Sequence, residues 1–161
     1  MSATTLEREA PAAQTAPPMP EVRGGVVAYL CLEGAFAASD FYVRAFGATE
    51  VGRMPPDAQG RTMHVHLYVN GTSVMLSDPF PEHGCGFQAP AGFNLMQVVD
   101  DVDASFARAL EAGATVIMPP QDMFWGARYG QVRDPFGVTW ALSSRAGECA
   151  MQDAMECAGR A

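Results

Sequence analysis

Apolar and polar residues alternate most regularly between Arg61 and Asn70. One face of a strand here would carry Met63, Val65, Leu67 and Val69, and the other would carry His64, His66 and Tyr68. Because successive side chains of a strand point to opposite sides, we expect the apolar set to lie under helices and the other set to face a cleft. Asn70-Gly71 is a strong hairpin signal, and Thr72–Ser77 returns as a strand.

The elements around this hairpin complete a first unit. Val26–Glu33 is a compact apolar run of strand length. In Ala35–Phe46 the apolar residues recur at helical spacing, and Gly47 follows in the position of a helix C-cap. Ala48–Met54 is a further strand, so the predicted order over residues 25–78 is β-α-β-β-β.

A connector rich in proline and glycine, residues 79–92, precedes a second unit at 93–145 in which the pattern starts again. Its predicted strands are Phe93–Val99, Ala114–Met118 and the two arms of a hairpin that turns at Asp134–Gly137. Between the first two strands we predict a helix that begins after a cap at Asp101 or Asp103, buries Phe106 and Leu110, and runs through Glu111 to Gly113.

The two halves are a repeat with one offset. Gly47-Ala48-Thr49 matches Gly113-Ala114-Thr115, and Gly71–Ser77 matches Gly137–Ser143. Both 113 − 47 and 137 − 71 give 66, so a single duplication explains both matches.

A duplicated unit of this kind predicts an α+β fold. Two β-α-β-β-β units form a curved mixed sheet, with the helices on its convex side and a concave cleft for a ligand. Residues 1–24 are predicted to be a flexible N-terminal tail, and 146–161 a C-terminal tail.

Composition excludes several classes of partner. The chain has 161 residues and a formal charge of -8, from 18 acidic and 10 basic residues, which argues against nucleic acid and anionic membranes as partners. No apolar run approaches the roughly 18 residues that span a bilayer. The cysteines at 31, 85, 149 and 157 show no CxxC spacing and no signal peptide precedes them, which predicts reduced thiols in a cytoplasmic protein.

Several motifs resemble the vicinal oxygen chelate superfamily, which includes glyoxalase I, bleomycin-resistance proteins and extradiol dioxygenases. The segments similar to its PhnB-like branch are FYVRAFGA (41–48), VMLSD (74–78), FPEHG (80–84), VDDVDASFARALEAGA (99–114) and DMFWGARYGQVRDPFGVTWAL (122–142). The resemblance covers about residues 25–145. It implies a homodimer with cleft-like sites and, in many members, a divalent metal.

The resemblance also indicates where metal ligands would lie, in the first and last strands of each unit. Carried onto this chain, the positions are Ala28, Met75, Asn94 and Ala141. None is His, Glu or Asp, and Met is too soft for a metal that prefers oxygen ligands. We therefore expect no metal cofactor of the usual kind. Ala127 stands where PhnB-like relatives commonly carry an acid.

The glycine-rich stretch Asp122–Gly137 holds the strongest candidates for ligand contact. Trp125 would stack on a flat ligand, Arg128 would pair with an oxyanion, and Tyr129 lies beside them; alternatively the stretch is a structural loop clamped to the sheet. His64 and His66, with Tyr68, Met75 and Asn94, are further candidates. The two histidines would contact ligand, transfer a proton, bind a metal with a third group, or have a structural role.

Two function classes remain open from the sequence. The first is a small-molecule-binding protein that holds or transforms an aromatic or oxyanion-bearing metabolite without a metal. The second is a lyase, isomerase or dioxygenase that depends on a divalent metal, with ligands relocated around His64 and His66. No nucleophile–base pair can be assembled, so no catalytic residue is assigned. The tail residues Cys149, Met151, Met155 and Cys157 form either an amphipathic appendage or a soft Cu(I) site.

Overall fold

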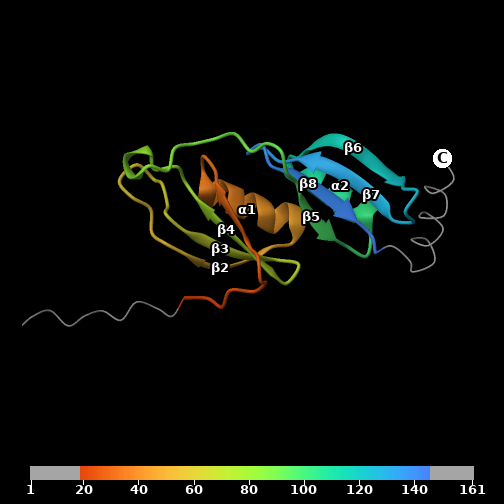
Figure 1. Cartoon of the computed structure of the whole chain (residues 1–161), viewed down its shortest axis with the longest axis horizontal. Coiled ribbons are helices and arrows are strands. Elements are labelled where there is room, and N and C mark those ends of the chain that lie inside the picture. The colour runs from red at the N-terminus through yellow and green to blue at the C-terminus, as the bar shows by residue number, and fades with distance from the viewer. Residues whose placement is uncertain (1–18, 146–161) are drawn as a thin grey trace, which may run out of the picture.

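The computed structural model describes residues 19–145, which form two β-α-β-β-β units (Figure 1). The first consists of β1 (Ala28–Cys31), α1 (Ala35–Phe46), β2 (Thr49–Arg53), β3 (Val65–Val69) and β4 (Thr72–Ser77). The second consists of β5 (Leu95–Val98), α2 (Val102–Ala112), β6 (Thr115–Asp122), β7 (Arg128–Arg133) and β8 (Thr139–Ser143). The connector between them contains a short 3-10 turn, η1 (Pro81–His83). The Cys/Met-rich C-terminal tail of the sequence analysis lies outside the described residues.

The strands form two four-stranded sheets with equivalent topology. Their orders are β1-β4-β3-β2 and β5-β8-β7-β6. In each sheet the first pair, β1 with β4 and β5 with β8, is parallel, and the remaining pairs are antiparallel. The predicted α+β class and duplication are therefore confirmed, with the strands divided between two mixed sheets.

The ends of both helices follow from residues in the sequence. Gly47 and Gly113 adopt left-handed conformations at the C-caps, with φ of 66° and 117°, which a residue with a side chain adopts only with strain. At the start of α2 the carboxylate of Asp101 accepts a hydrogen bond from the Ala104 N–H at 2.9 Å. Asp101, and not Asp103, is thus the cap of this helix.

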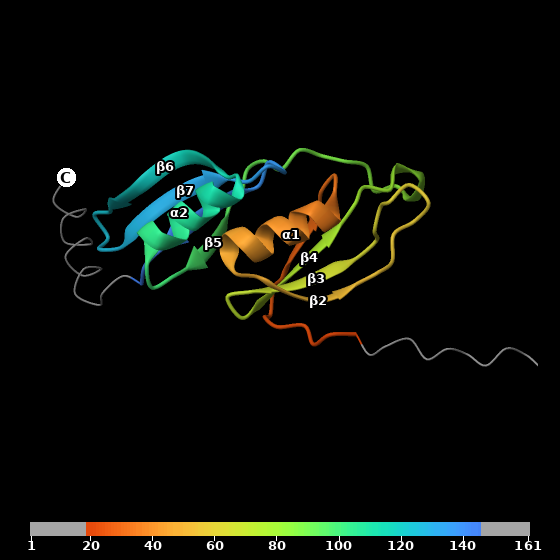
Figure 2. The same cartoon turned by 180° about the vertical axis from the view of Figure 1, so that it is seen from behind.

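One hydrophobic core is shared by both units, because each helix covers one face of its own sheet and the helices contact each other (Figures 1 and 2). The ring of Phe46 on α1 stacks on Trp140 of β8 with centroids 4.1 Å apart. Tyr42, one turn earlier, meets the same indole edge-on at 5.1 Å. Aromatic side chains of this size bury large apolar areas, so the contact joins the units into one folding unit.

A buried carboxylate lies at the same junction. Asp134, only 4% exposed, begins the turn between β7 and β8. Its Oδ2 accepts hydrogen bonds from the Tyr42 hydroxyl at 2.8 Å and the Trp140 indole N–H at 3.1 Å. Its Oδ1 accepts from the backbone N–H groups of Phe136 and Val138, at 2.9 and 2.8 Å. Burial raises the pKa of Asp134, and these four donors act in the opposite direction.

The predicted faces of β3 are confirmed except at one end. Val65, Leu67 and Val69 are buried in the core, and His66 lies on the opposite face. Met63 is 52% exposed and precedes the strand, so its predicted place under the helix is wrong. The strand starts late because Thr62 is held in an irregular turn: its N–H donates to Asp78 at 2.8 Å and its hydroxyl to the Met54 carbonyl at 3.0 Å.

Candidate ligand-binding site

Each sheet has one face that carries no helix, which we call its open face. On the first sheet the residues that share this face, by strand register, are Tyr29, Cys31, His64, His66, Tyr68, Ser73, Met75 and Ser77. The Tyr29 hydroxyl contacts Nδ1 of His64 at 3.1 Å, and the rings of His64 and His66 are 6.1 Å apart. Four of the predicted site residues, His64, His66, Tyr68 and Met75, are thus brought together on one surface.

His66 is the most buried of these four residues, at 1% exposed. Its Nε2 lies 2.8 Å from the Ser73 hydroxyl, whereas its Nδ1 is buried without a hydrogen-bond partner among the described residues. The Nε2 of His64 is likewise buried and unpartnered within that part of the chain. Burial lowers the pKa of His66, and the neighbouring His64 lowers it further, so the ring is neutral in the folded protein at pH 7.

Residues 21–23, which were predicted to belong to the flexible N-terminal tail, cover the end of the first open face near Tyr68 and Ser73. The Arg23 N–H donates to the Ser73 hydroxyl at 2.8 Å, and the Arg23 carbonyl accepts from the Ser73 N–H at 2.9 Å. The Tyr68 hydroxyl donates to the Glu21 carbonyl at 2.6 Å, and the Arg23 guanidinium lies 4.0 Å from the centre of the Tyr68 ring. The segment therefore occupies the part of the face near His66 and leaves the end near Tyr29 and His64 open.

Acidification is expected to destabilise the protein through His66. The pKa of His66 is lower in the folded state than in the unfolded state. Below about pH 6.5 the unfolded state therefore binds a proton that the folded state does not bind. The free energy of unfolding should fall as pH drops from about 6.5 to the folded pKa, by at most about 1.4 kcal/mol per pH unit for one proton. Urea unfolding between pH 7.5 and 5 measures this.

The variant His66→Gln keeps a polar partner for Ser73 and removes the titration, so its stability should depend less on pH. The exposed His83, changed to Gln, is the matched control. Equal pH dependence in wild type and His66→Gln would show that His66 is not the group responsible.

The second open face contains a pocket of about 620 Å³. Trp125 and Tyr129 form one wall, with ring centroids 5.9 Å apart and planes at 75°. The remaining lining residues are Met96, Val98, Ala127, Ser143, Ser144 and Arg145. With the two rings at this angle, a flat ligand can contact the face of one ring and the edge of the other.

A tight turn at 123–127 aims Trp125 into this position. The Met123 N–H donates to the Ala127 carbonyl at 2.9 Å, and the Gly126 N–H donates to the Met123 carbonyl at 2.8 Å. Gly126 has a φ of 80°, the left-handed conformation that favours glycine. After the turn, the Arg128 N–H donates to the Ser144 hydroxyl and the Ser144 N–H donates to the Arg128 carbonyl, at 2.9 Å each, which fixes the start of β7 against the end of β8.

Arg128 does not join Trp125 and Tyr129 in this pocket. Being adjacent to Tyr129 in a strand, it points to the other face, toward α2. Its guanidinium donates to both carboxylate oxygens of Asp103, and to Asp122 at 3.1 Å. The cation that lines the pocket is Arg145. No sequence pattern distinguished Arg145 as a candidate, since it enters the pocket only through the pairing of β8 with β7.

In the first strands of the two units the open faces carry Tyr29 and Met96, and not Ala28 and Asn94, the positions that the resemblance indicated for metal ligands. Tyr29 pairs with Met75, and Met96 pairs with Ala141, so these four side chains share the open faces. Ala28 packs against the core and Asn94 is exposed before β5 begins. Since α1 has 12 residues and α2 has 11, the offset of the repeat is 67 before the helices and 66 after them, which makes Met96 the equivalent of Tyr29.

These residues do not fit the metal that the family often carries. Tyr29, Met75, Met96 and Ala141 offer no imidazole or carboxylate, the ligands that Zn²⁺, Mn²⁺ and Fe²⁺ use. Among residues 19–145 there is also no cluster of three or more His, Cys, Asp or Glu side chains placed to hold a metal ion.

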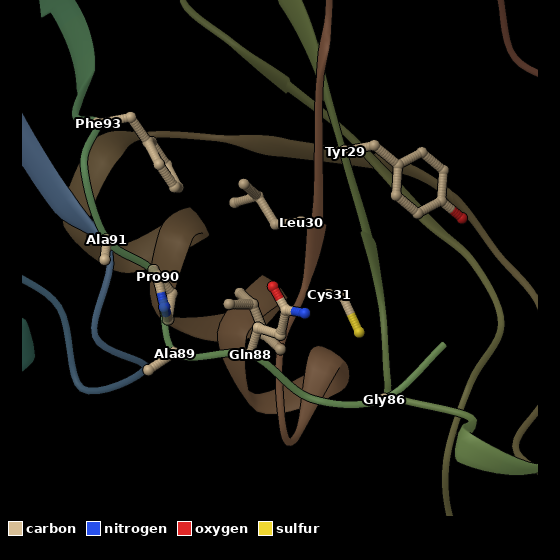
Figure 3. A pocket seen from close by; sticks show the side chains of 10 residues that line it. Tyr29, Leu30, Cys31, Gly86, Gln88, Ala89, Pro90, Ala91 and Phe93 are labelled. Carbon is tan, nitrogen blue, oxygen red and sulfur yellow. The ribbon is translucent and has the colours of Figure 1, made fainter. Parts of the chain in front are cut away.

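A further pocket of about 320 Å³ lies where the connector passes the end of β1. Figure 3 shows the connector residues Gly86, Gln88 and Pro90 along one side and β1 along the other. Phe93 closes one end of the pocket. Cys31 faces this connector, and the side chain of Tyr29 points away toward the open face of the first sheet (Figure 3).

Comparison with known proteins identifies the family. Residues 29–142 match the Glyoxalase/Bleomycin resistance protein/Dioxygenase superfamily, to which the chain therefore belongs. The protein Mb0911c of Mycobacterium bovis is 44% identical over 135 residues, which cover 78% of this chain and 86% of Mb0911c. None of the helices within residues 19–145 is long and apolar enough to cross a membrane.

Solved structures of the same fold include TioX from Micromonospora sp. ML1. It is 31% identical, with a TM-score of 0.59 over 75% of this chain and 98% of TioX. A PhnB protein from Bacillus cereus, at 22% identity, has a TM-score of 0.58 over 76% of this chain and all of its own. The latter similarity shows the fold alone, so the PhnB-like branch remains a prediction.

Proposed function

We propose that this protein binds a flat aromatic small molecule on the open face of its second sheet, without a bound metal ion. The observation that carries the proposal is the pocket lined by Trp125 and Tyr129. The indole stacks on an aromatic ring, and the side chains of Met96 and Val98 contribute apolar contacts beneath it.

Polar groups around the pocket define the ligand further. The Tyr129 hydroxyl accepts a hydrogen bond from Gln131 at 2.8 Å, so its own O–H can donate to the ligand. Arg145 supplies a positive charge at the rim, in a chain whose overall charge is -8. An aromatic ligand with one carboxylate or enolate is therefore preferred, because its anionic group pairs with Arg145.

A homodimer is part of the proposal. Tyr29 and Met96, large side chains on the edge strands β1 and β5 of the two open faces, are 53% and 61% exposed. A second copy of the chain would cover these faces and narrow the pocket, which opens broadly to solvent in one chain.

The test of the proposal compares 2-naphthoate with its saturated analogue, decahydronaphthalene-2-carboxylate. Both carry the same charge, but only naphthoate is flat and aromatic. Isothermal titration in EDTA is expected to show naphthoate binding at least tenfold more tightly. Equal affinities for the two acids would contradict recognition by stacking.

One observation favours the second function class, a metal-dependent enzyme. Nε2 of His64 and Nδ1 of His66 are buried on neighbouring side chains, and neither has a partner within residues 19–145. Imidazole nitrogens of this kind bind Zn²⁺, Ni²⁺ or Mn²⁺ when a third ligand is supplied, for example by a partner chain.

We expect that untagged, chelator-treated protein has no site of micromolar affinity for Zn²⁺, Ni²⁺ or Mn²⁺. The amount of each metal bound with that affinity should be below about 0.1 equivalent. Titration calorimetry measures this, and His64→Ala is the matched control. Stoichiometric binding by wild type that is lost in His64→Ala would replace our proposal with the metal-dependent class.

A further inference from the structure

Two thiols from distant parts of the chain lie in contact beside the connector pocket. Sγ of Cys31, the last residue of β1, is 3.9 Å from Sγ of Cys85 in the connector. Cys31 is half-buried and Cys85 is exposed, so a reagent in solution reaches Cys85 first. Their separation of 54 positions means that only the fold brings them together.

The connector is held in place next to β1 by contacts of its own. Phe80 and Cys85 form an antiparallel bridge around η1, with hydrogen bonds of 2.6 and 3.1 Å in the two directions. The guanidinium of Arg61 lies 4.3 Å from the centre of the Phe80 ring and pairs with Glu82 at 2.5 Å. Cys85 therefore faces Cys31 because of a built turn, and not by chance contact of a loose loop.

A disulfide between these residues needs only a small movement. The S–S bond is about 2.05 Å, so the two sulfurs must approach each other by roughly 2 Å. Glycines stand on both sides of Cys85, at 84 and 86, and neither has a neighbouring atom within 4 Å of the position of a Cβ. The backbone around Cys85 thus has the freedom and the space to move toward β1.

We propose that Cys31 and Cys85 form a reversible dithiol–disulfide site whose substrate is a low-molecular-weight disulfide such as glutathione disulfide. The bond would tie the connector to β1 and fix one wall of the pocket shown in Figure 3. The proposal is independent of the proposed ligand pocket, which lies on the second sheet.

The reaction proceeds by two exchanges. The Cys85 thiolate attacks one sulfur of the small disulfide, whose S–S bond breaks, and the first leaving thiolate takes the Cys85 proton. Cys31 then loses its proton and attacks Sγ of Cys85, and the second thiolate leaves with that proton. The two protein thiols are oxidised, and the small disulfide is reduced to two thiols.

The order of the two steps follows from the surroundings of the thiols. Burial raises the pKa of the Cys31 thiol, and the adjacent Cys85 raises it further, so Cys31 is a weak first nucleophile. A mixed disulfide is therefore expected on Cys85 before the intramolecular bond forms.

Tryptic mapping of the whole chain tests the proposal. Cleavage after arginine places Cys31 in peptide 24–44, Cys85 in peptide 62–108, and the two remaining cysteines together in peptide 146–160. After equilibration with glutathione disulfide and alkylation, more than about half of peptide 24–44 should be linked to peptide 62–108 by a disulfide. Dithiothreitol should return both peptides to the singly alkylated form.

Two serine variants make the test specific. Cys31→Ser should accumulate glutathione on peptide 62–108, which contains Cys85. In Cys85→Ser, the fraction of peptide 24–44 that carries glutathione should be at least fivefold lower than the fraction of peptide 62–108 that carries it in Cys31→Ser. Circular dichroism confirms that each variant is folded. If wild type instead yields both peptides unlinked, alkylated or carrying glutathione separately, the proposal is wrong.

Discussion

Replacing Asp134 by alanine is expected to lower the free energy of unfolding by about 3–5 kcal/mol. The carboxylate accepts four hydrogen bonds at the junction of the two units. Alanine would leave the Tyr42 hydroxyl and the Trp140 indole N–H without an acceptor in the core, and each such buried donor costs about 1–3 kcal/mol. Two backbone N–H groups of the turn would lose their partner as well.

Urea unfolding monitored by circular dichroism measures this loss. Tyr42→Phe removes one of the four donors and should cost about 1.5–3 kcal/mol, because the bond involves a charged acceptor. Asp134→Asn should fall between the two, since its amide nitrogen cannot accept. Asp100→Ala, at an exposed position, is the matched control and should change stability by less than about 0.5 kcal/mol. A loss below about 1 kcal/mol in Asp134→Ala would show that the carboxylate does not join the units.

Replacing Trp125 by alanine is expected to weaken binding of 2-naphthoate by about 30-fold, which corresponds to about 2 kcal/mol. The indole forms a wall of the pocket and offers its face to a flat ring. The loss should appear in the dissociation constant measured by titration calorimetry, with little change in stability, because Trp125 is only half-buried.

Phe124→Ala is the matched control for Trp125→Ala. Phe124 is the neighbouring aromatic residue, is 77% exposed and does not line the pocket. Its removal should change naphthoate affinity by less than about threefold. A Trp125→Ala protein that binds naphthoate normally but unfolds at lower urea would support the alternative, a structural loop clamped to the sheet.

The secondary structure could be predicted from local sequence signals because these signals act over a few residues. The bounds of α1 and β4 coincide with the predicted Ala35–Phe46 and Thr72–Ser77. Alternation along β3 correctly placed His64, His66 and Tyr68 opposite the core. The glycines after the helices gave both C-caps and the register of the repeat at that point.

The parts of the site that could not be predicted depend on contacts distant in sequence. Arg128 was grouped with Trp125 and Tyr129 by proximity along the chain, but the pleat of β7 and the carboxylates of Asp103 and Asp122 direct it away. The equivalence of Tyr29 and Met96 was missed because the extra residue in α1 makes the offset of the repeat 67, and not 66, before the helices. A repeat offset alone does not define which face of a strand a residue occupies.

The aromatic stretch at 122–137 has two halves, one in the proposed ligand site and one in the junction between the units. Its first half, through Trp125 and Tyr129, lines the pocket on the open face. Its second half, through Asp134, holds the helix of the first unit against the last hairpin. The function of one half and the stability contributed by the other can therefore be separated by single substitutions.

The most direct measurement of the central claim is an NMR titration of the two indole N–H signals with 2-naphthoate in EDTA. The chain has two tryptophans, and Trp140 is buried in the core. We expect the Trp125 signal to shift and saturate, and that of Trp140 to stay within the line width. The shift of the Trp125 signal should be the same with and without EDTA. A Trp125 signal that does not respond, or that responds only when a divalent metal is added, would contradict it.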